Sequence, residues 1–309
     1  MPIRLRAALG AAAVALACAG CGLGLGAGPG TSSISLTVTR DFGSVPVRTV
    51  TAAHVPGSET VMRMLERSFS VTTRYGGGFV QSIDGLAPAG SDHDWFYYVN
   101  GIEAPAGAAA TAVHRGDHIW WDLHDYGATQ TIPAVVGSFP EPFTTGIGGK
   151  RYPTTLECAA DVGAACRQAT TELDAQHVPL AGQLLGTGSG SDTLGVVVGT
   201  WSDLRPEIAA QLLAHGPGAS GVYARFADAG SALELLDPSG AVVRTLGPGA
   251  GLVAATGDSS QTPTWLITGT DAAGVIAAAR ALTPQALHDH FALAVEGGAR
   301  FPVPLEPSR

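Results

Sequence analysis

Two aromatic runs place the strongest limit on how this chain can fold. Residues 94–104 read DWFYYVNGIEA and residues 116–126 read GDHIWWDLHDY, in a chain whose overall aromatic content is only 6%. Aromatic and β-branched residues favour strands, and the dipeptides Asn100-Gly101 and Gly116-Asp117 favour tight turns. The runs therefore predict two strands of a small antiparallel sheet with a large aromatic surface.

A helix is predicted to cover one face of this sheet. Ser58 or Thr60 can cap its first turn, and its apolar residues recur at helical spacing, at Val61, Leu65 and Phe69. Side chains alternate along a strand, so one row of the second aromatic run fits this apolar stripe. That row is Ile119, Trp121 and Leu123.

The other row of the same run consists of Trp120, Asp122 and His124. We expect it to face solvent, where an exposed Trp marks a contact site for a ligand or partner. The alternative is that the second half of the chain covers this face. The full set of candidate ligand-binding residues is Phe79, Trp95, Tyr97, Tyr98, Trp120, Asp122 and His124.

Two further runs complete a small α+β unit over residues 34–130. Residues 35–40 alternate apolar and polar side chains, and residues 79–85 form a strand-like run that ends at the turn dipeptide Asp84-Gly85. The predicted order is strand, helix, strand, strand, strand, which is an α+β arrangement.

These segments resemble the transcobalamin-like C-terminal domain family, which includes bacterial surface proteins and the small β-domain of transcobalamin and intrinsic factor. The resemblance covers residues 34–130, and its most specific parts are the turns at 98–101 and 116–117. It implies a transcobalamin β-domain-like fold and a domain that closes over one side of a corrinoid. It also implies a partner, either a helical-barrel protein that holds the other side or a vitamin importer.

The N-terminus has the anatomy of a secretory signal over residues 1–21. Arg4 and Arg6 precede an apolar run from 7 to 17, and Ala19-Gly20-Cys21 resembles a lipoprotein cleavage site. This predicts a lipid anchor on Cys21, although cleavage by the ordinary signal peptidase remains an alternative. Residues 22–33 read as a flexible tether. We therefore expect an exported protein on the outer face of the cytoplasmic membrane.

Composition excludes one class of partner. The formal net charge is −9 and the pI is about 5.4. Binding to nucleic acid requires clustered Lys and Arg to neutralise phosphates, and the sequence contains no such cluster.

The second half is predicted to be a separate unit over residues 151–303. The three prolines within 133–142 favour an extended connector, which we place at 131–150. The apolar run 194–200 has the pattern of a buried central strand, and helical and strand-like segments alternate around it. We expect an α/β or α+β sandwich, with Ser202 capping the helix after this strand.

Cys158 and Cys166 are the two cysteines left after the predicted processing. In an oxidising compartment an even, closely spaced pair favours a disulfide. No further metal ligands lie near them, and a CxxC motif is absent.

Four patterns could carry chemistry, and a simpler interpretation is favoured for each. Ser220 lies among glycines without the spacing of a nucleophile elbow, the Gly-rich run 186–191 lacks the Lys of a P-loop, and Asp271 fits a helix cap better than an anion site. The fourth pattern is a group of metal-ligand side chains without a recognised metal motif. It comprises Asp92, His93, Asp94, His114, His118, Asp122, His124 and Asp125.

The sequence thus predicts an exported ligand-binding lipoprotein and no enzyme. A corrinoid is the ligand implied by the resemblance, and no cofactor or metal is expected. The alternative is a structural or interaction module of the cell envelope that binds no small molecule.

Overall fold

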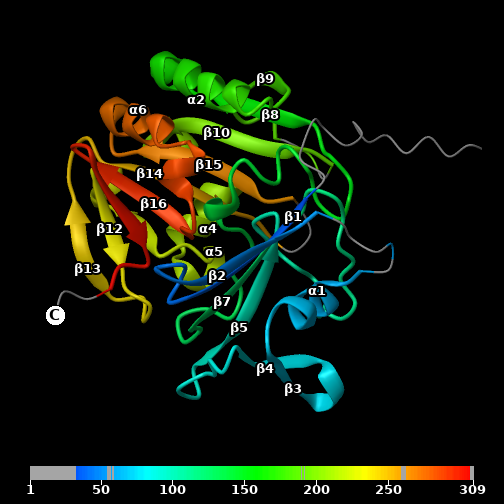
Figure 1. Ribbon diagram of the computed structural model, residues 1–309. Coiled ribbons are helices and arrows are strands. Elements are labelled where there is room, and N and C mark those ends of the chain that lie inside the picture. The colour runs from blue at the N-terminus through cyan, green and yellow to red at the C-terminus, as the bar shows by residue number, and fades with distance from the viewer. Residues whose placement is uncertain are drawn as a thin grey trace, which may run out of the picture.

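The computed structural model describes residues 33–53, 57, 59–188, 190, 192–258 and 262–306. The predicted signal peptide, Cys21 and nearly all of the tether lie outside these residues. Among the residues described, no helix is long and apolar enough to span a membrane. The chain is a mixed α+β protein with several sheets and few helices (Figure 1).

The aromatic runs belong to a five-stranded sheet with the order β2-β1-β7-β5-β6. The aromatic strands β5 and β7 pair antiparallel, as predicted, but β1 pairs parallel with β7. A parallel pair needs a long connection, and the chain between β1 and β7 contains the other strands and a helix. The strands are β1 (Ile34–Arg40), β2 (Val45–Ala52), β5 (His93–Val99), β6 (Ile102–Glu103) and β7 (His118–Asp125).

Helix α1 (Val61–Ser68) covers one face of this sheet, as predicted. The Thr60 side chain caps it by accepting a hydrogen bond from the Arg63 backbone N–H. Its apolar side chains share a core with the predicted inner row Ile119, Trp121 and Leu123.

A separate hairpin follows, formed by β3 (Val71–Arg74), the 3-10 turn η1 (Tyr75–Gly77) and β4 (Phe79–Ile83).

The second half is built on a seven-stranded sheet with the order β17-β16-β14-β15-β10-β8-β9. Strands β9, β8, β10 and β15 run parallel, and every residue of β10 is buried, as the sequence predicted for this strand. The strands are β8 (Thr154–Cys158), β9 (Leu180–Leu184), β10 (Leu194–Thr200), β14 (Gly251–Thr256), β15 (Thr264–Gly269), β16 (Ala292–Glu296) and β17 (Ala299–Val303).

Helices and a small sheet cover the two faces of this large sheet (Figure 1). On one face lie α2 (Gly163–Ala175) and α6 (Ala272–Arg280). The core on the other face includes residues of α3 (Trp201–Leu204), α4 (Ile208–Ala214) and a three-stranded sheet. The remaining elements are β11 (Ala224–Ala227), β12 (Ala232–Leu236), β13 (Val242–Leu246), α5 (Pro217–Ser220), α7 (Pro284–Leu287), η2 (Val136–Ser138), η3 (Ala160–Val162) and η4 (Asp228–Gly230).

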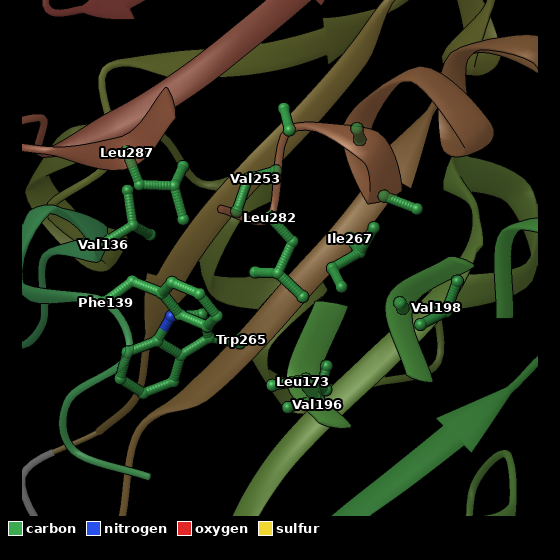
Figure 2. Close-up of a cluster of buried hydrophobic side chains, with 14 of the residues drawn as sticks. Val136, Phe139, Leu173, Val196, Val198, Val253, Trp265, Ile267, Leu282 and Leu287 are labelled. Carbon is green, nitrogen blue, oxygen red and sulfur yellow. The ribbon is translucent and has the colours of Figure 1, made fainter. Parts of the chain in front are cut away.

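Residues 131–150 do not form the extended connector that the sequence predicted. Val136, Phe139 and Phe143 are buried in the core of the seven-stranded sheet, and the Phe143 ring lies 4.8 Å from the Trp265 ring. Figure 2 shows Val136 and Phe139 on the same side of this core as Trp265. Prolines favour extended backbone, but burial of these apolar side chains outweighs that preference and folds the segment into turns.

Of two helix caps predicted from the sequence, Asp271 is confirmed and Ser202 is wrong. Asp271 caps α6, since its Oδ1 accepts a hydrogen bond of 2.9 Å from the Gly274 N–H. Ser202 does not cap the helix after β10. Thr200 is the N-cap of α3, and Asp203 completes a capping box by accepting from the Thr200 N–H at 3.0 Å. The sequence favoured the wrong hydroxyl because the strand ends directly at the helix, without a loop.

Cys158 and Cys166 form the predicted disulfide, between the end of β8 and the first turns of α2. We expect the double substitution of both cysteines by Ala to lower the free energy of unfolding by about 2–3 kcal/mol, because the unfolded chain loses a short loop constraint. Urea unfolding of the oxidised protein and of the variant would measure this. Equal midpoints would show that the bond contributes nothing.

Candidate functional site

The predicted outer row does not face solvent. Trp120, Asp122 and His124 are 0%, 0% and 1% exposed, because residues of the second half cover this face. The Phe291 ring, which precedes β16, lies 5.2 Å from the Trp120 ring and 5.3 Å from the His124 ring. The second half of the chain therefore covers this face, which was the alternative interpretation of the sequence. The row is part of the contact between the two sheets.

Asp122 is the most heavily bonded member of the row. Its Oδ1 accepts from the Phe42 N–H at 3.0 Å and contacts His124 Nδ1 at 2.8 Å. Its Oδ2 accepts from the Gly43 N–H at 2.9 Å and from Thr39 Oγ1 at 2.5 Å. A buried carboxylate with four partners fixes the turn after β1, where Phe42 adopts a positive φ of 56°.

Besides its contact with Asp122, His124 is held by stacking between two aromatic rings, and Trp120 is held by a hydrogen bond. The His124 ring lies between Phe42 at 4.5 Å and Phe96 at 4.4 Å, stacked on both. Trp120 donates its indole N–H to Thr39 Oγ1 at 2.6 Å. The Trp120 indole N–H, both Asp122 oxygens and His124 Nδ1 thus have internal partners, which suits a packed contact between the sheets.

The other predicted aromatic residues divide between the two faces of β5. Trp95 is 8% exposed in the core under α1, and Tyr97 is half-buried with its ring stacked on Trp121 at 4.8 Å. Tyr98 is fully buried on the opposite face, where its ring lies 5.6 Å from Phe291. Phe79 is the one predicted ligand-binding residue that the structure leaves exposed, with 62% of its surface accessible.

Titratable groups line the contact between the sheets, and burial shifts their pKa values. Burial lowers the pKa of His118 to about 4, with a smaller effect from the charge of His288. The His118 ring contacts Ser138 Oγ at 2.9 Å and Thr37 Oγ1 at 3.2 Å, so a neutral imidazole is accommodated. Burial raises the pKa of Glu103 to about 7, while the Ile132 N–H, which donates to its carboxylate, lowers it.

The predicted metal-ligand residues do not converge. His118, Asp122 and His124 lie in the contact between the sheets, whereas His114 pairs with Asp117 at the turn before β7. Asp92 precedes β5, and His93 and Asp94 begin it, with His93 opposite Asp125 in the register of β5 and β7. Within the described ranges, no three His, Cys, Asp or Glu side chains form a group that could hold a metal ion.

Ser220 is fully buried at the end of α5, and its Oγ donates to the Gly216 carbonyl at 2.9 Å. It is the last residue of this short helix, whereas the sequence favoured a turn. The Gly-rich run 186–191 is described only in part. Gly186 and Gly188 have positive φ and follow the edge strand β9, consistent with a loop.

An exposed aromatic pair stands at the tip of the β3–β4 hairpin. Tyr75 and Phe79 are 84% and 62% exposed, and their rings meet edge to face at 5.8 Å. They border a pocket of about 360 Å³. The pocket is also lined by Arg74, Val80, Gln81, Ala87, Pro88, Gly90, Ser91, His93, Asp94 and Tyr126.

The base of the hairpin is fixed, whereas its tip projects. Val80 and Ile83 are buried in the core under α1, and Asp84 accepts from the Ser70 N–H at 2.8 Å. Tyr75 adopts a positive φ of 53°, which is costly for a bulky residue and recurs at functional sites. Sequence reasoning missed Tyr75, Arg74 and Tyr126 as site residues. The signal was present in the three glycines after Tyr75, which allow a sharp turn.

We expect Asp122→Asn to lower the free energy of unfolding by about 2–4 kcal/mol, because an amide cannot accept all the hydrogen bonds that the buried carboxylate accepts. Urea unfolding measures this. Asp92→Asn is the matched control, since Asp92 is exposed and its side chain accepts, among the described residues, from Ser91 alone. It should change stability by less than about 0.5 kcal/mol. Equal effects of the two changes would contradict this role for Asp122.

Glu103 makes stability depend on pH. Its pKa rises from 4.5 to about 7 on folding, so the folded state binds the extra proton between these values and loses stability as the pH rises through them. Glu103→Gln removes this penalty and can still accept from Ile132. We expect the variant to exceed the wild type by on the order of 1 kcal/mol at pH 8, after allowance for partial solvent screening, and to gain little at pH 4.5. A gain that is the same at both pH values would refute this assignment.

Residues 58–125, which include α1, the hairpin and the strands β5 and β7, match a family described as "Domain of unknown function (DUF4430)". A crystal structure provisionally described as a metal binding protein from Ruminococcus gnavus ATCC 29149 is 18% identical, with a TM-score of 0.26. The match covers 30% of this chain and 97% of that one. No curated protein matches the chain.

Proposed function

We propose that the chain is an exported, lipid-anchored protein that binds a flat, amphipathic ligand in the pocket beside the β3–β4 hairpin. The observation that carries this proposal is the exposed Tyr75–Phe79 pair at the rim of that pocket. Exposed large aromatic side chains that meet each other mark contact surfaces more often than isolated ones do. The anchor on Cys21 and the export follow from the predicted leader.

The lining of the pocket supports a ligand with both apolar and polar parts. Tyr75 and Phe79 offer aromatic faces and edges, while Arg74, His93 and Asp94 offer charged or polar groups. Tyr126 borders the pocket with its hydroxyl bonded to the Ser91 carbonyl at 2.6 Å, so this wall is fixed before a ligand arrives. A few placed polar groups beside aromatic surfaces are typical of small-molecule sites.

A corrinoid is the ligand class to test first, because of the resemblance of residues 34–130 to the transcobalamin-like family. A pocket of about 360 Å³ is at the small end of ligand sites and would hold one edge of so large a molecule. The other side would then be held by a partner, such as a helical-barrel protein or a vitamin importer. We also propose that the five-stranded sheet and α1 together have a fold like that of the transcobalamin β-domain.

We expect the purified protein to bind cobinamide or cobalamin in calorimetry, and Tyr75→Ala and Phe79→Ala each to weaken binding about tenfold or more through loss of aromatic contact. Leu184→Ala is the matched control, because Leu184 is 82% exposed on a distant strand and should leave binding unchanged. The absence of heat up to millimolar ligand would refute corrinoid binding by this chain alone.

The rival function is an interaction module that buries the same aromatic pair against another protein of the cell envelope. A partner recovered from envelope extracts by the wild type and lost with Phe79→Ala, together with silent calorimetry, would favour this rival over the ligand-binding proposal.

A further inference from the structure

Strand β9 lies at one edge of the seven-stranded sheet and, among the described residues, pairs with β8 alone. Proteins usually protect such an edge with a short strand, a proline or a charged side chain, because an open edge can pair with another chain. The other outer strands of the two large sheets have this protection. Strand β6 has only two residues, while β2 carries Pro46 and Arg48 and β17 carries Arg300 and Pro302. Strand β9 reads Leu-Ala-Gly-Gln-Leu and has no proline or charged side chain.

The side chains of β9 are accessible on both faces of the sheet. The four residues from Ala181 to Leu184 are exposed, and Leu184 is 82% exposed. Successive side chains point to opposite faces of a strand, so four exposed residues in a row leave both faces open. A Cβ atom on Gly182 would meet no described atom within 4 Å. This edge of the sheet is therefore open to another strand.

Charge favours a second copy of this chain as the source of that strand. The formal net charge is −9, so two copies repel each other over most of their surfaces. Residues 178–188 are an exception, because they read VPLAGQLLGTG and contain no charged side chain. Like charges directly opposite each other destabilise paired strands, and a self-contact through this stretch brings none of them together.

The order of residues in β9 suits pairing with itself. In an antiparallel pair centred on Gly182, each Leu180 lies opposite Leu184 of the second copy, and each Ala181 lies opposite Gln183. Leu180 already packs against the core of the seven-stranded sheet. Pairing would place the exposed Leu184 of one copy beside this partly buried Leu180 of the other, so the apolar side chains of the two strands share one face.

We propose that two copies of this chain associate through β9, antiparallel about a two-fold axis at Gly182, so that the seven-stranded sheet continues from one copy into the other. Such a contact is closed, because each copy uses the same strand and leaves no further open edge there. Five paired residues from each copy form a small interface, so we expect a weak dimer with a dissociation constant on the order of 100 µM. This contact does not depend on the proposed binding of a ligand at the hairpin.

Sedimentation equilibrium of the purified protein from about 5 to 500 µM tests the association. We expect the apparent mass to rise with concentration toward twice that of one chain. Gln183→Lys places a charge of the protective kind on the edge and should raise the dissociation constant at least about tenfold. Val242→Lys is the matched control, because Val242 is 41% exposed on β13, an outer strand that already carries Arg244. A wild type that stays monomeric at the highest concentration, or equal weakening by both lysines, would overturn the inference.

A cysteine on the two-fold axis tests the register. The two copies of Gly182→Cys would face each other with Cα atoms about 4.5–5.5 Å apart, within the range that a disulfide allows. The two copies of Ala181→Cys would be offset by two residues along the strands, beyond the roughly 7 Å limit. On a non-reducing gel after mild oxidation we expect a linked dimer for Gly182→Cys, and no more than the wild-type background for Ala181→Cys. Equal linkage in the two variants would indicate chance collision and contradict the proposed pairing.

Discussion

The buried carboxylate of Asp122 holds together the face of the five-stranded sheet on which the second half packs. It joins β7, the end of β1 and the turn after β1, and it orients the His124 ring that stacks between Phe42 and Phe96. Phe291 from the second half then closes over the same rings. A carboxylate can be buried here because its four partners replace the water it loses.

Close approach of the backbones reinforces this contact. A Cβ atom on Gly43 would lie 1.9 Å from the carbonyl oxygen of Asp289, so only glycine fits between the turn and the loop before β16. The φ of Gly43 is 80°, in the region that favours glycine. The segment 131–150 adds to the same core through Val135, while its neighbour Val136 is buried in the core on the opposite face of the seven-stranded sheet. The two halves therefore share apolar surface and are not simply tethered.

Local patterns in the sequence predicted local structure well and long-range packing poorly. Strand alternation placed Trp121 under α1 correctly, and the spacing of Cys158 and Cys166 predicted their disulfide. Alternation identified Trp120 as belonging to the opposite face, but it carries no information about what covers that face. Strand β9 was missed because nearly all of its side chains are exposed and give no apolar pattern. Of the candidate site, the sequence identified Phe79 and missed Tyr75, whose role depends on a turn conformation.

Because the second half covers Trp120, Asp122 and His124, this row is not available to contact a ligand. One face of the five-stranded sheet is used by α1, and the other is used by Phe291 and its neighbours. The hairpin tip stays accessible and carries the exposed aromatic side chains Tyr75 and Phe79, whereas the hairpin base buries Val80 and Ile83. If the second half were removed, Trp120, Tyr98 and Phe42 would lose the apolar groups that shield them, and a large aromatic patch would meet water. The second half therefore buries one aromatic surface of the first, and among the described residues the aromatic side chains that stay largely exposed are Tyr75 and Phe79.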